Sequence, residues 1–175
     1  SNKQTTICGD IMDKSVQLSR RKMFVLTTTS LITSSLMGFA GTGQLDIYVV
    51  KNAQCGCCDA WVKILSERGF NVTTENQSRD RLMEYKAESG IPEAMRSCHT
   101  ARIDSYFIEG HVPASDIKRL LTERPDVLGL AVPGMPYGSP GMGSEENREA
   151  YDVFIIRRNG TFEVFQHYPK AGVLV

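Results

Sequence analysis

The sequence predicts an α/β fold in which helices flank a central mixed sheet and an additional hairpin follows at the C-terminal end. Two observations predict it. Short β-rich segments alternate along the chain with segments whose apolar residues recur at helical spacing. Near the C-terminal end, two β-rich segments over 151–157 and 161–165 flank Arg158-Asn159-Gly160. Because an Asn-Gly pair suits a tight turn, these two segments are expected to form the hairpin.

The first half of the layout contains two strand–helix pairs. Residues 45–50 alternate and are rich in β-branched side chains, which predicts a strand. Apolar residues fall at helical spacing over 58–68, and Gly69 then provides a stop signal. A second strand is expected over 70–74 and a second helix over 79–89, which another glycine ends.

The second half begins with two short strands, expected over 100–103 and 106–108, and continues with a helix over 114–123 that Pro113 starts. Residues 129–143 are rich in Gly and Pro and show little apolar periodicity, so we expect a loop there. The resulting order of strand, helix, strand, helix, strand, strand and helix is a thioredoxin-like arrangement.

The N-terminal segment resembles a targeting signal rather than part of the fold. A basic cluster over 19–22 precedes a mostly apolar stretch over 23–39, and Gly38-Phe39-Ala40 offers small residues for a cleavage site. This is the order of a bacterial secretory signal, so we predict export to the periplasm through a cleaved signal. An uncleaved amphipathic anchor, which would be the chain's only route to a membrane, and a cytosolic helix are the alternatives.

The predicted domain organisation follows from that signal. Residues 1–40 form the targeting segment and residues 41–175 form the functional domain. Met12 is a candidate for the true start, in which case residues 1–11 lie upstream and Cys8 is irrelevant.

Composition excludes several classes of function. Lys and Arg together number 20, as do Asp and Glu, so the formal net charge is zero and nucleic acid is not expected as a partner. Hydrophobic residues make up 41% of the chain, which is ordinary for a globular protein. Phosphate-binding loops and hydrolase motifs are absent from the sequence, so NTPase and hydrolase functions are not expected.

A cluster of cysteines carries the chemistry. Cys55, Cys57 and Cys58 fall within four residues, and Cys98 lies in a second motif further along the chain. Thiolates are soft ligands that suit Cu(I), Zn(II) and iron–sulfur centres. Cys55 and Cys58 also have the C-x-x-C spacing of thiol–disulfide redox sites. The cluster lies between the first strand and first helix, where thioredoxin-like folds keep such a pair.

Other side chains could extend this site. His111 lies between a strand and a helix, where loops carry function. Met135 and Met142 lie in the Gly- and Pro-rich loop, and thioethers are neutral soft ligands for Cu(I). His99 is expected to point away from Cys98, because successive residues of an extended segment face opposite ways.

Four separated motifs together resemble the CopG-like family, long catalogued as a domain of unknown function and associated with bacterial copper resistance. The resemblance runs from about residue 47 to residue 165. The motifs are the Cys-x-Cys-Cys cluster with its following Trp, Arg-Ser-Cys-His-Thr-Ala at 96–101, Glu-Gly-His-Val-Pro-Ala-x-Asp-Ile at 109–117, and the Met-containing Gly/Pro run at 132–142. The resemblance implies a thioredoxin-like fold, a periplasmic address, a multinuclear copper centre bridged by cysteine thiolates, and interconversion of Cu(I) and Cu(II).

The leading hypothesis is therefore an exported copper-binding protein for copper resistance that acts with other periplasmic copper-handling proteins. The expected ligands are the thiols of Cys55, Cys57, Cys58 and Cys98, with the imidazole of His111 and the thioethers of Met135 and Met142. Whether the chain is an enzyme, as a copper oxidoreductase, stays open. Two alternatives remain: a periplasmic thiol–disulfide oxidoreductase that uses Cys55 and Cys58, and a structural zinc domain.

Overall fold

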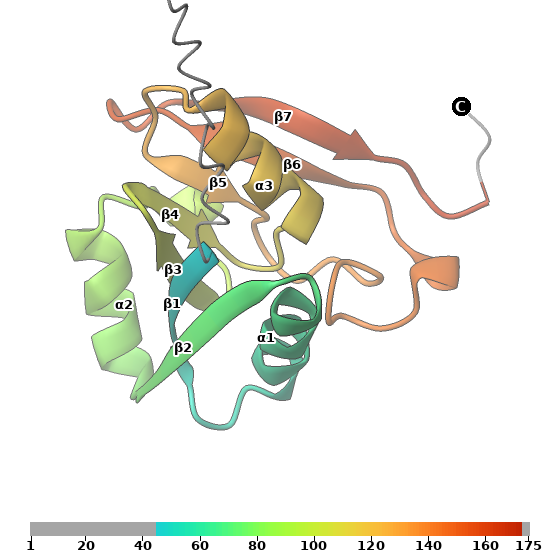
Figure 1. The fold of residues 1–175 in the computed structure, drawn as a ribbon, viewed down its shortest axis with the longest axis horizontal. Helices are drawn as coiled ribbons and strands as arrows, with labels where there is room; N and C mark the ends of the chain where they lie inside the picture. The colour runs from blue at the N-terminus through green and yellow to red at the C-terminus, as the bar shows by residue number, and fades with distance from the viewer. Residues whose placement is uncertain (1–44, 173–175) are drawn as a thin grey trace, which may run out of the picture. The chain divides into compact units, whose positions relative to one another are not determined.

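The computed structural model describes residues 45–172, and it contains the predicted order of strand, helix, strand, helix, strand, strand and helix (Figure 1). The predicted signal over residues 1–40 and the candidate start at Met12 lie outside the described residues. Within residues 45–172, no helix has the length and apolar character needed to cross a membrane.

In residues 45–172, seven strands form one mixed sheet in the order β2-β1-β3-β4-β5-β6-β7. The strands are β1 (Leu45–Asn52), β2 (Phe70–Gln77), β3 (His99–Ile103), β4 (Tyr106–Glu109), β5 (Gly129–Ala131), β6 (Tyr151–Ile156) and β7 (Phe162–Tyr168). The pairs β1–β2 and β4–β5 are parallel, and the other neighbouring pairs are antiparallel. The mixed sheet and the C-terminal hairpin, β6–β7, confirm the predicted fold class.

The described part of the chain has three α-helices, which cover the sheet: α1 (Gly56–Glu67), α2 (Arg79–Glu88) and α3 (Ala114–Glu123). In Figure 1, α2 lies on the opposite side of strands β1 to β4 from α1 and α3. The main core lies on the α1 and α3 face, where Trp61 and Leu65 of α1 and Ile117 and Leu120 of α3 pack against the strands. We call the two sides the α1 face and the α2 face.

Strand β5 lies inside the segment over 129–143 that was expected to be entirely loop, so that expectation is wrong. Its three residues are all buried, and they pair with both β4 and β6. Gly129 is required at this crossing, because a Cβ there would lie 1.7 Å from the backbone oxygen of Phe107. A strand of three residues is too short to show an alternation of apolar and polar side chains, so the sequence pattern could not predict it.

The alternation of β3 and β4 places the functional side chains. His99, Ala101 and Ile103 are buried toward the α1 face, whereas Thr100 reaches the α2 face. Thr100 pairs in register with Glu109 at the end of β4. The beginning of β3 and the end of β4 therefore carry buried polar groups on both faces of the sheet.

Candidate metal centre

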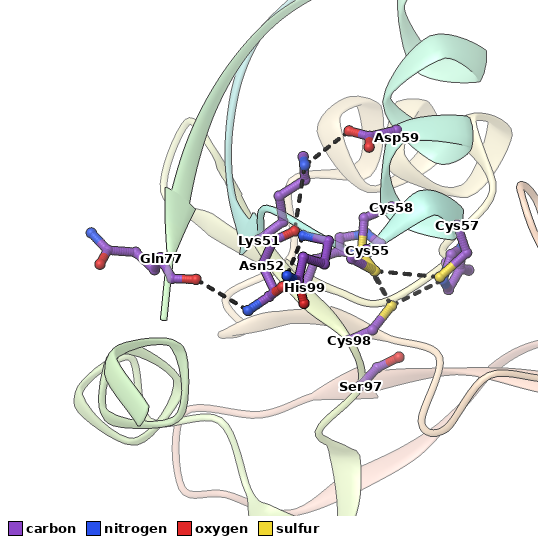
Figure 2. The surroundings of a disulfide bond; sticks show 12 residues. Lys51, Asn52, Cys55, Cys57, Cys58, Asp59, Gln77, Ser97, Cys98 and His99 are labelled. Carbon is purple, nitrogen blue, oxygen red and sulfur yellow. Dashed lines mark hydrogen bonds and ion pairs between the residues drawn. A yellow bond between two sulfur atoms is a disulfide. The ribbon is translucent and has the colours of Figure 1, made fainter. Parts of the chain in front are cut away.

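Four sulfur atoms meet at the N-terminal end of α1. Cys55 immediately precedes the helix, Cys57 and Cys58 lie in its first turn, and Cys98 approaches from the segment before β3. Cys57 Sγ is 3.4 Å from Cys55 Sγ, and Cys58 Sγ is 3.6 Å from Cys98 Sγ (Figure 2). All four sulfurs lie within 4.8 Å of one another, so the fold unites the two predicted cysteine motifs.

The structure joins Cys55 and Cys58 in a disulfide, whereas Cys57 and Cys98 are free thiols. Cysteine binds a metal ion as the thiolate. While the disulfide is intact, only Cys57 and Cys98 can therefore act as thiolate ligands. Reduction of the disulfide by two electrons yields the full set. The site thus combines a disulfide-bonded pair with two free thiols that contact it.

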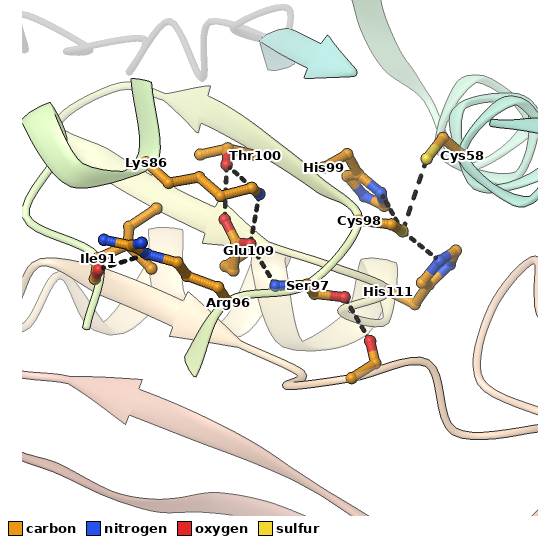
Figure 3. A network of polar contacts seen from close by, with 11 residues as sticks. Cys58, Lys86, Ile91, Arg96, Ser97, Cys98, His99, Thr100, Glu109 and His111 are labelled. Carbon is orange, nitrogen blue, oxygen red and sulfur yellow. Dashed lines mark hydrogen bonds and ion pairs between the residues drawn. The ribbon is translucent and has the colours of Figure 1, made fainter. Parts of the chain in front are cut away.

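Two imidazoles complete the surroundings of Cys98. Cys98 Sγ lies 3.0 Å from His111 Nε2 and 3.3 Å from His99 Nδ1 (Figure 3). Both histidines are fully buried, and the ring centroids of His99 and Trp61 are 4.3 Å apart. The three ligand atoms of Cys98, His99 and His111 form a second group within 4.8 Å.

The expectation that His99 points away from Cys98 is wrong. Cys98 lies in a bend before β3 begins, so strand alternation does not relate the two side chains. His99 Nε2 is the one buried side-chain nitrogen or oxygen without a hydrogen-bond partner among the described residues. Leaving such an atom unpaired costs about 1–3 kcal/mol, so the nitrogen is a candidate ligand atom.

His111 is oriented by the Gly- and Pro-rich loop. Its Nδ1–H donates to the carbonyl of Pro140 at 2.8 Å, which leaves the lone pair of Nε2 directed at Cys98. Gly110 makes this approach possible, because a Cβ there would lie 2.5 Å from both Ser97 Oγ and Val132 O. The backbone therefore brings His111 against Cys98 only with glycine at position 110.

The same loop lies against the beginning of α1. A Cβ at Gly141 would lie 2.8 Å from the backbone nitrogen of Trp61 and 3.0 Å from the carbonyl oxygen of Cys57. Met142 follows directly and is half-buried, whereas Met135 is 56% exposed. The loop contacts the site through its backbone, and ligation by the two thioethers stays a prediction.

Burial sets the protonation of the donor atoms. It raises the pKa of Cys98 to about 12, with the nearby Cys57 adding to the shift. Burial also lowers the pKa of His111 and, more strongly, that of His99. At neutral pH the imidazoles are thus neutral and their lone pairs are available, while the Cys98 proton leaves when a cation takes its place.

The donor set consists of soft sulfurs with neutral imidazoles, which suits Cu(I) and also Zn(II). Three cysteines come from one segment and one from another, whereas structural zinc sites ordinarily use two separated pairs. The arrangement fits copper binding with thiolates that can bridge neighbouring ions.

The chain is similar to one described family and to two solved structures. Residues 95–142 match a family described as "Protein of unknown function, DUF411". Two solved structures are similar over 72% of this chain, and no curated protein matches it. "Copper resistance protein copG- Form 2" is 47% identical, with 99% of that chain covered and a TM-score of 0.66. "Copper resistance protein copG- Form 1" is 46% identical, with 98% covered and a TM-score of 0.68.

Proposed function

This chain belongs to the CopG copper-resistance family, and we propose that it is an exported protein that binds several copper ions. The observation that carries the proposal is the convergence of four sulfurs within 4.8 Å. The proposed ligands are the thiolates of Cys55, Cys57, Cys58 and Cys98. A thiolate can bridge two soft cations, so four of them at this spacing favour more than one Cu(I) per chain.

The neighbouring side chains would extend the site beyond Cu(I). Imidazole suits both oxidation states of copper, and His111 already directs Nε2 toward Cys98. His99 adds a second buried nitrogen without a hydrogen-bond partner. Met135 and Met142 are proposed to cover the site from the loop that holds His111 in place.

The Cys55–Cys58 pair suggests how the protein could interconvert copper ions. Oxidation of two thiolates to one disulfide releases two electrons, which reduce two Cu(II) to two Cu(I). Reduction of the disulfide by an external dithiol then restores the four thiols. We propose this copper oxidoreductase step together with a periplasmic address, which the signal-like pattern over residues 1–40 supports. Other periplasmic copper-handling proteins would supply or receive the ions.

Anaerobic titration of the reduced chain with Cu(I), in competition with a colorimetric Cu(I) chelator, tests the proposal. We expect more than one tightly bound Cu(I) per chain, and loading with copper rather than zinc when both are supplied. A single bound copper, or preferential loading with zinc, would contradict the cluster and favour the structural zinc alternative.

The variant Cys57→Ser distinguishes copper binding from disulfide chemistry. A bridged copper cluster needs the middle thiol, so the variant should bind fewer Cu(I) ions while keeping its fold. The matched control is the parent chain with its disulfide intact, which should also bind fewer Cu(I) ions until it is reduced.

The disulfide itself favours a second candidate function, a thiol–disulfide oxidoreductase that uses Cys55 and Cys58. This activity needs only these two cysteines, so it should survive in Cys57→Ser. Reduction of insulin by the parent, together with full copper loading of Cys57→Ser, would establish the second candidate in place of the first.

A further inference from the structure

A buried network of charged and polar groups lies behind Cys98, on the α2 face of the sheet (Figure 3). Lys86 of α2 and Glu109 of β4 are both fully buried, and Lys86 Nζ lies 2.5 Å from Glu109 Oε1. Lys86 also donates to Thr100 Oγ1 at 2.8 Å, and Thr100 donates to Glu109 Oε2 at 2.6 Å. The backbone N–H of Ser97 donates to Glu109 Oε1 at 2.6 Å.

A buried ion pair of this kind is not expected to stabilise the fold more than apolar side chains would. Desolvation of two charges is costly, and well-packed apolar side chains in the same place are often equally or more stabilising. The local core on this face is apolar, with Ile91, Met95, Ala131 and Ile156. A role beyond stability would explain why charged groups are buried on this apolar face.

The carboxylate of Glu109 binds on both sides of the Cys98–His99 pair. Oε1 holds the main-chain nitrogen of Ser97, which precedes Cys98, and Oε2 holds the side chain of Thr100, which follows His99. Thr100 is paired with Glu109 in the β3–β4 ladder, whereas Ser97 and Cys98 lie before β3 begins. The Ser97 amide is thus the point where the segment that carries Cys98 is attached to the sheet.

Two other contacts converge on this segment. Ser97 Oγ donates to the carbonyl of Gly134 in the Gly- and Pro-rich loop. Glu109 is also two residues from His111, whose Nε2 contacts Cys98 Sγ. One carboxylate therefore sets the backbone from which Cys98 projects and lies in the strand that leads to its imidazole neighbour.

We propose that Glu109, held by Lys86, is a positioning residue for the copper site: its carboxylate anchors the Ser97 amide and so holds Cys98 Sγ between Cys58 and His111. This inference rests on the proposed copper function for its consequence, though the positioning itself is a property of the metal-free protein. Neither Lys86 nor Glu109 contacts the sulfurs. Glu109 acts through the Ser97 amide and Lys86 acts by holding Glu109, while the Lys86 charge also lowers the pKa of Cys98 by a smaller amount than burial raises it.

A pair of isosteric variants separates the anchor from the charges. In Lys86→Met/Glu109→Gln, both charges are removed, but the Gln oxygen can still accept from the Ser97 amide while its NH₂ donates to Thr100. In Lys86→Met/Thr100→Val/Glu109→Leu, the network becomes apolar and only the Ser97 N–H loses its acceptor. The triple variant leaves no buried charge unpaired, so we expect it to fold.

Two measurements on the full chain are needed, with urea unfolding to confirm that each variant is folded. The first is Cu(I) affinity by chelator competition, which we expect to fall by about 10- to 100-fold in the triple variant, as for other losses outside a metal's direct ligands. The second is the rate at which iodoacetamide alkylates Cys98 in the reduced, metal-free chain. Arg96 and Arg102 place Cys98 in a tryptic peptide of its own, apart from the other cluster cysteines, so mass spectrometry can follow it.

The triple variant should show faster alkylation of Cys98 and weaker Cu(I) binding than the Gln double variant. Because both variants lack the charges of Lys86 and Glu109, the double variant controls for the direct effect of Lys86 on the Cys98 pKa. Parent-like values in a folded triple variant would overturn the proposal and leave the network a purely structural role. Equal defects in both variants would also overturn it, because the charges rather than the amide anchor would then be responsible. If the parent itself fails to bind Cu(I), the copper function fails, while the alkylation rates still decide the positioning.

Should the triple variant not fold, Ser97→Pro and Ser97→Ala answer the same question. Ser97→Pro removes the anchored N–H, and the residue before it, Arg96, already has an extended backbone that suits a following proline. Ser97→Ala removes only the hydroxyl. Faster alkylation of Cys98 in the proline variant than in the alanine variant supports the anchor, and equal rates contradict it.

Discussion

The two faces of strands β3 and β4 bury polar groups in opposite ways. On the α2 face, Lys86, Thr100 and Glu109 satisfy one another through short hydrogen bonds. On the α1 face, His99 leaves Nε2 without a partner among the described residues, and the thiol of Cys98 contacts groups that bind soft metals. A buried network whose hydrogen bonds are all made anchors the backbone. Buried polar atoms that lack a hydrogen-bond partner instead indicate where a ligand binds.

The pKa shifts of the buried groups also differ between the two faces. Burial raises the pKa of Glu109 and lowers the pKa of Lys86, and the contact between the two opposes both shifts. The pKa of His99 falls well below its usual value because burial has no compensating carboxylate partner. The α2 face holds its charges by pairing them, while the α1 face holds neutral donors.

The largest effect is expected from breaking the pair on the α2 face. Glu109→Leu leaves Lys86 buried without its counterion and should lower the free energy of unfolding by about 3–5 kcal/mol. Urea unfolding monitored by the fluorescence of Trp61 measures this. Lys86→Met/Glu109→Leu is the control and should recover most of the loss. A single variant as stable as the parent would show that the ion pair is not what satisfies this face.

A smaller effect of opposite sign is expected on the α1 face. His99→Leu removes a buried nitrogen without a hydrogen-bond partner, so the metal-free protein should gain about 1–3 kcal/mol in the free energy of unfolding. At the same time, the increase in melting temperature on adding Cu(I) should shrink.

The matched control for that variant is His111→Leu. It leaves the Pro140 carbonyl without its donor, so the metal-free protein should lose stability rather than gain it. A loss of stability in His99→Leu, with an unchanged response to Cu(I), would mean that His99 is an ordinary core residue.

The methionines of the loop offer a test with little effect on stability. Met135→Leu/Met142→Leu preserves volume, so the cost in the free energy of unfolding should stay below about 1.5 kcal/mol. Leu has no lone pair to donate, so we expect faster transfer of Cu(I) to a chelator, or the loss of one copper. Parent-like copper content and transfer rate would make both methionines loop fillers and leave His111 beside the thiols.

The smallest effect concerns a buried carboxyl outside both clusters. Asp116 of α3 accepts a hydrogen bond from Tyr168 at 2.8 Å, and burial raises the pKa of Asp116 above its usual 3.8. The folded state thus binds this proton more tightly than the unfolded state. Its contribution to stability is present below pH 3.8 and is lost as the pH rises through the folded-state pKa.

Asp116→Asn removes that titration while keeping an acceptor for Tyr168. The difference in urea unfolding between parent and variant should therefore shift in favour of the variant as the pH rises from acidic values toward neutral. A difference that does not depend on pH would show that Asp116 titrates alike in the folded and unfolded chain.

Local patterns determined much of the architecture. The helix α3 begins and ends at the predicted residues, 114 and 123, because Pro113 and the apolar spacing act within one segment. The helix α1 begins at Gly56, two residues before its predicted start. The sequence does not signal this start, because no side chain caps the helix and its first turn contains cysteines rather than apolar residues at helical spacing. The sequence also predicted the position of the cysteine cluster between a strand and a helix. The family resemblance followed from the residues of four separate motifs.

Only the tertiary structure decided which groups meet. Strand β5 exists because β4 and β6 pair with it on both sides, which three residues cannot signal by period. Lys86 and Glu109 are 23 residues apart and each looks like a surface residue in sequence, yet the folded sheet buries both. The bend before β3 turns Cys98 toward His99, against the alternation that a continuous strand would impose. Local periodicity reports the direction of a side chain only where the backbone is regular, and the proposed copper site lies where that regularity ends.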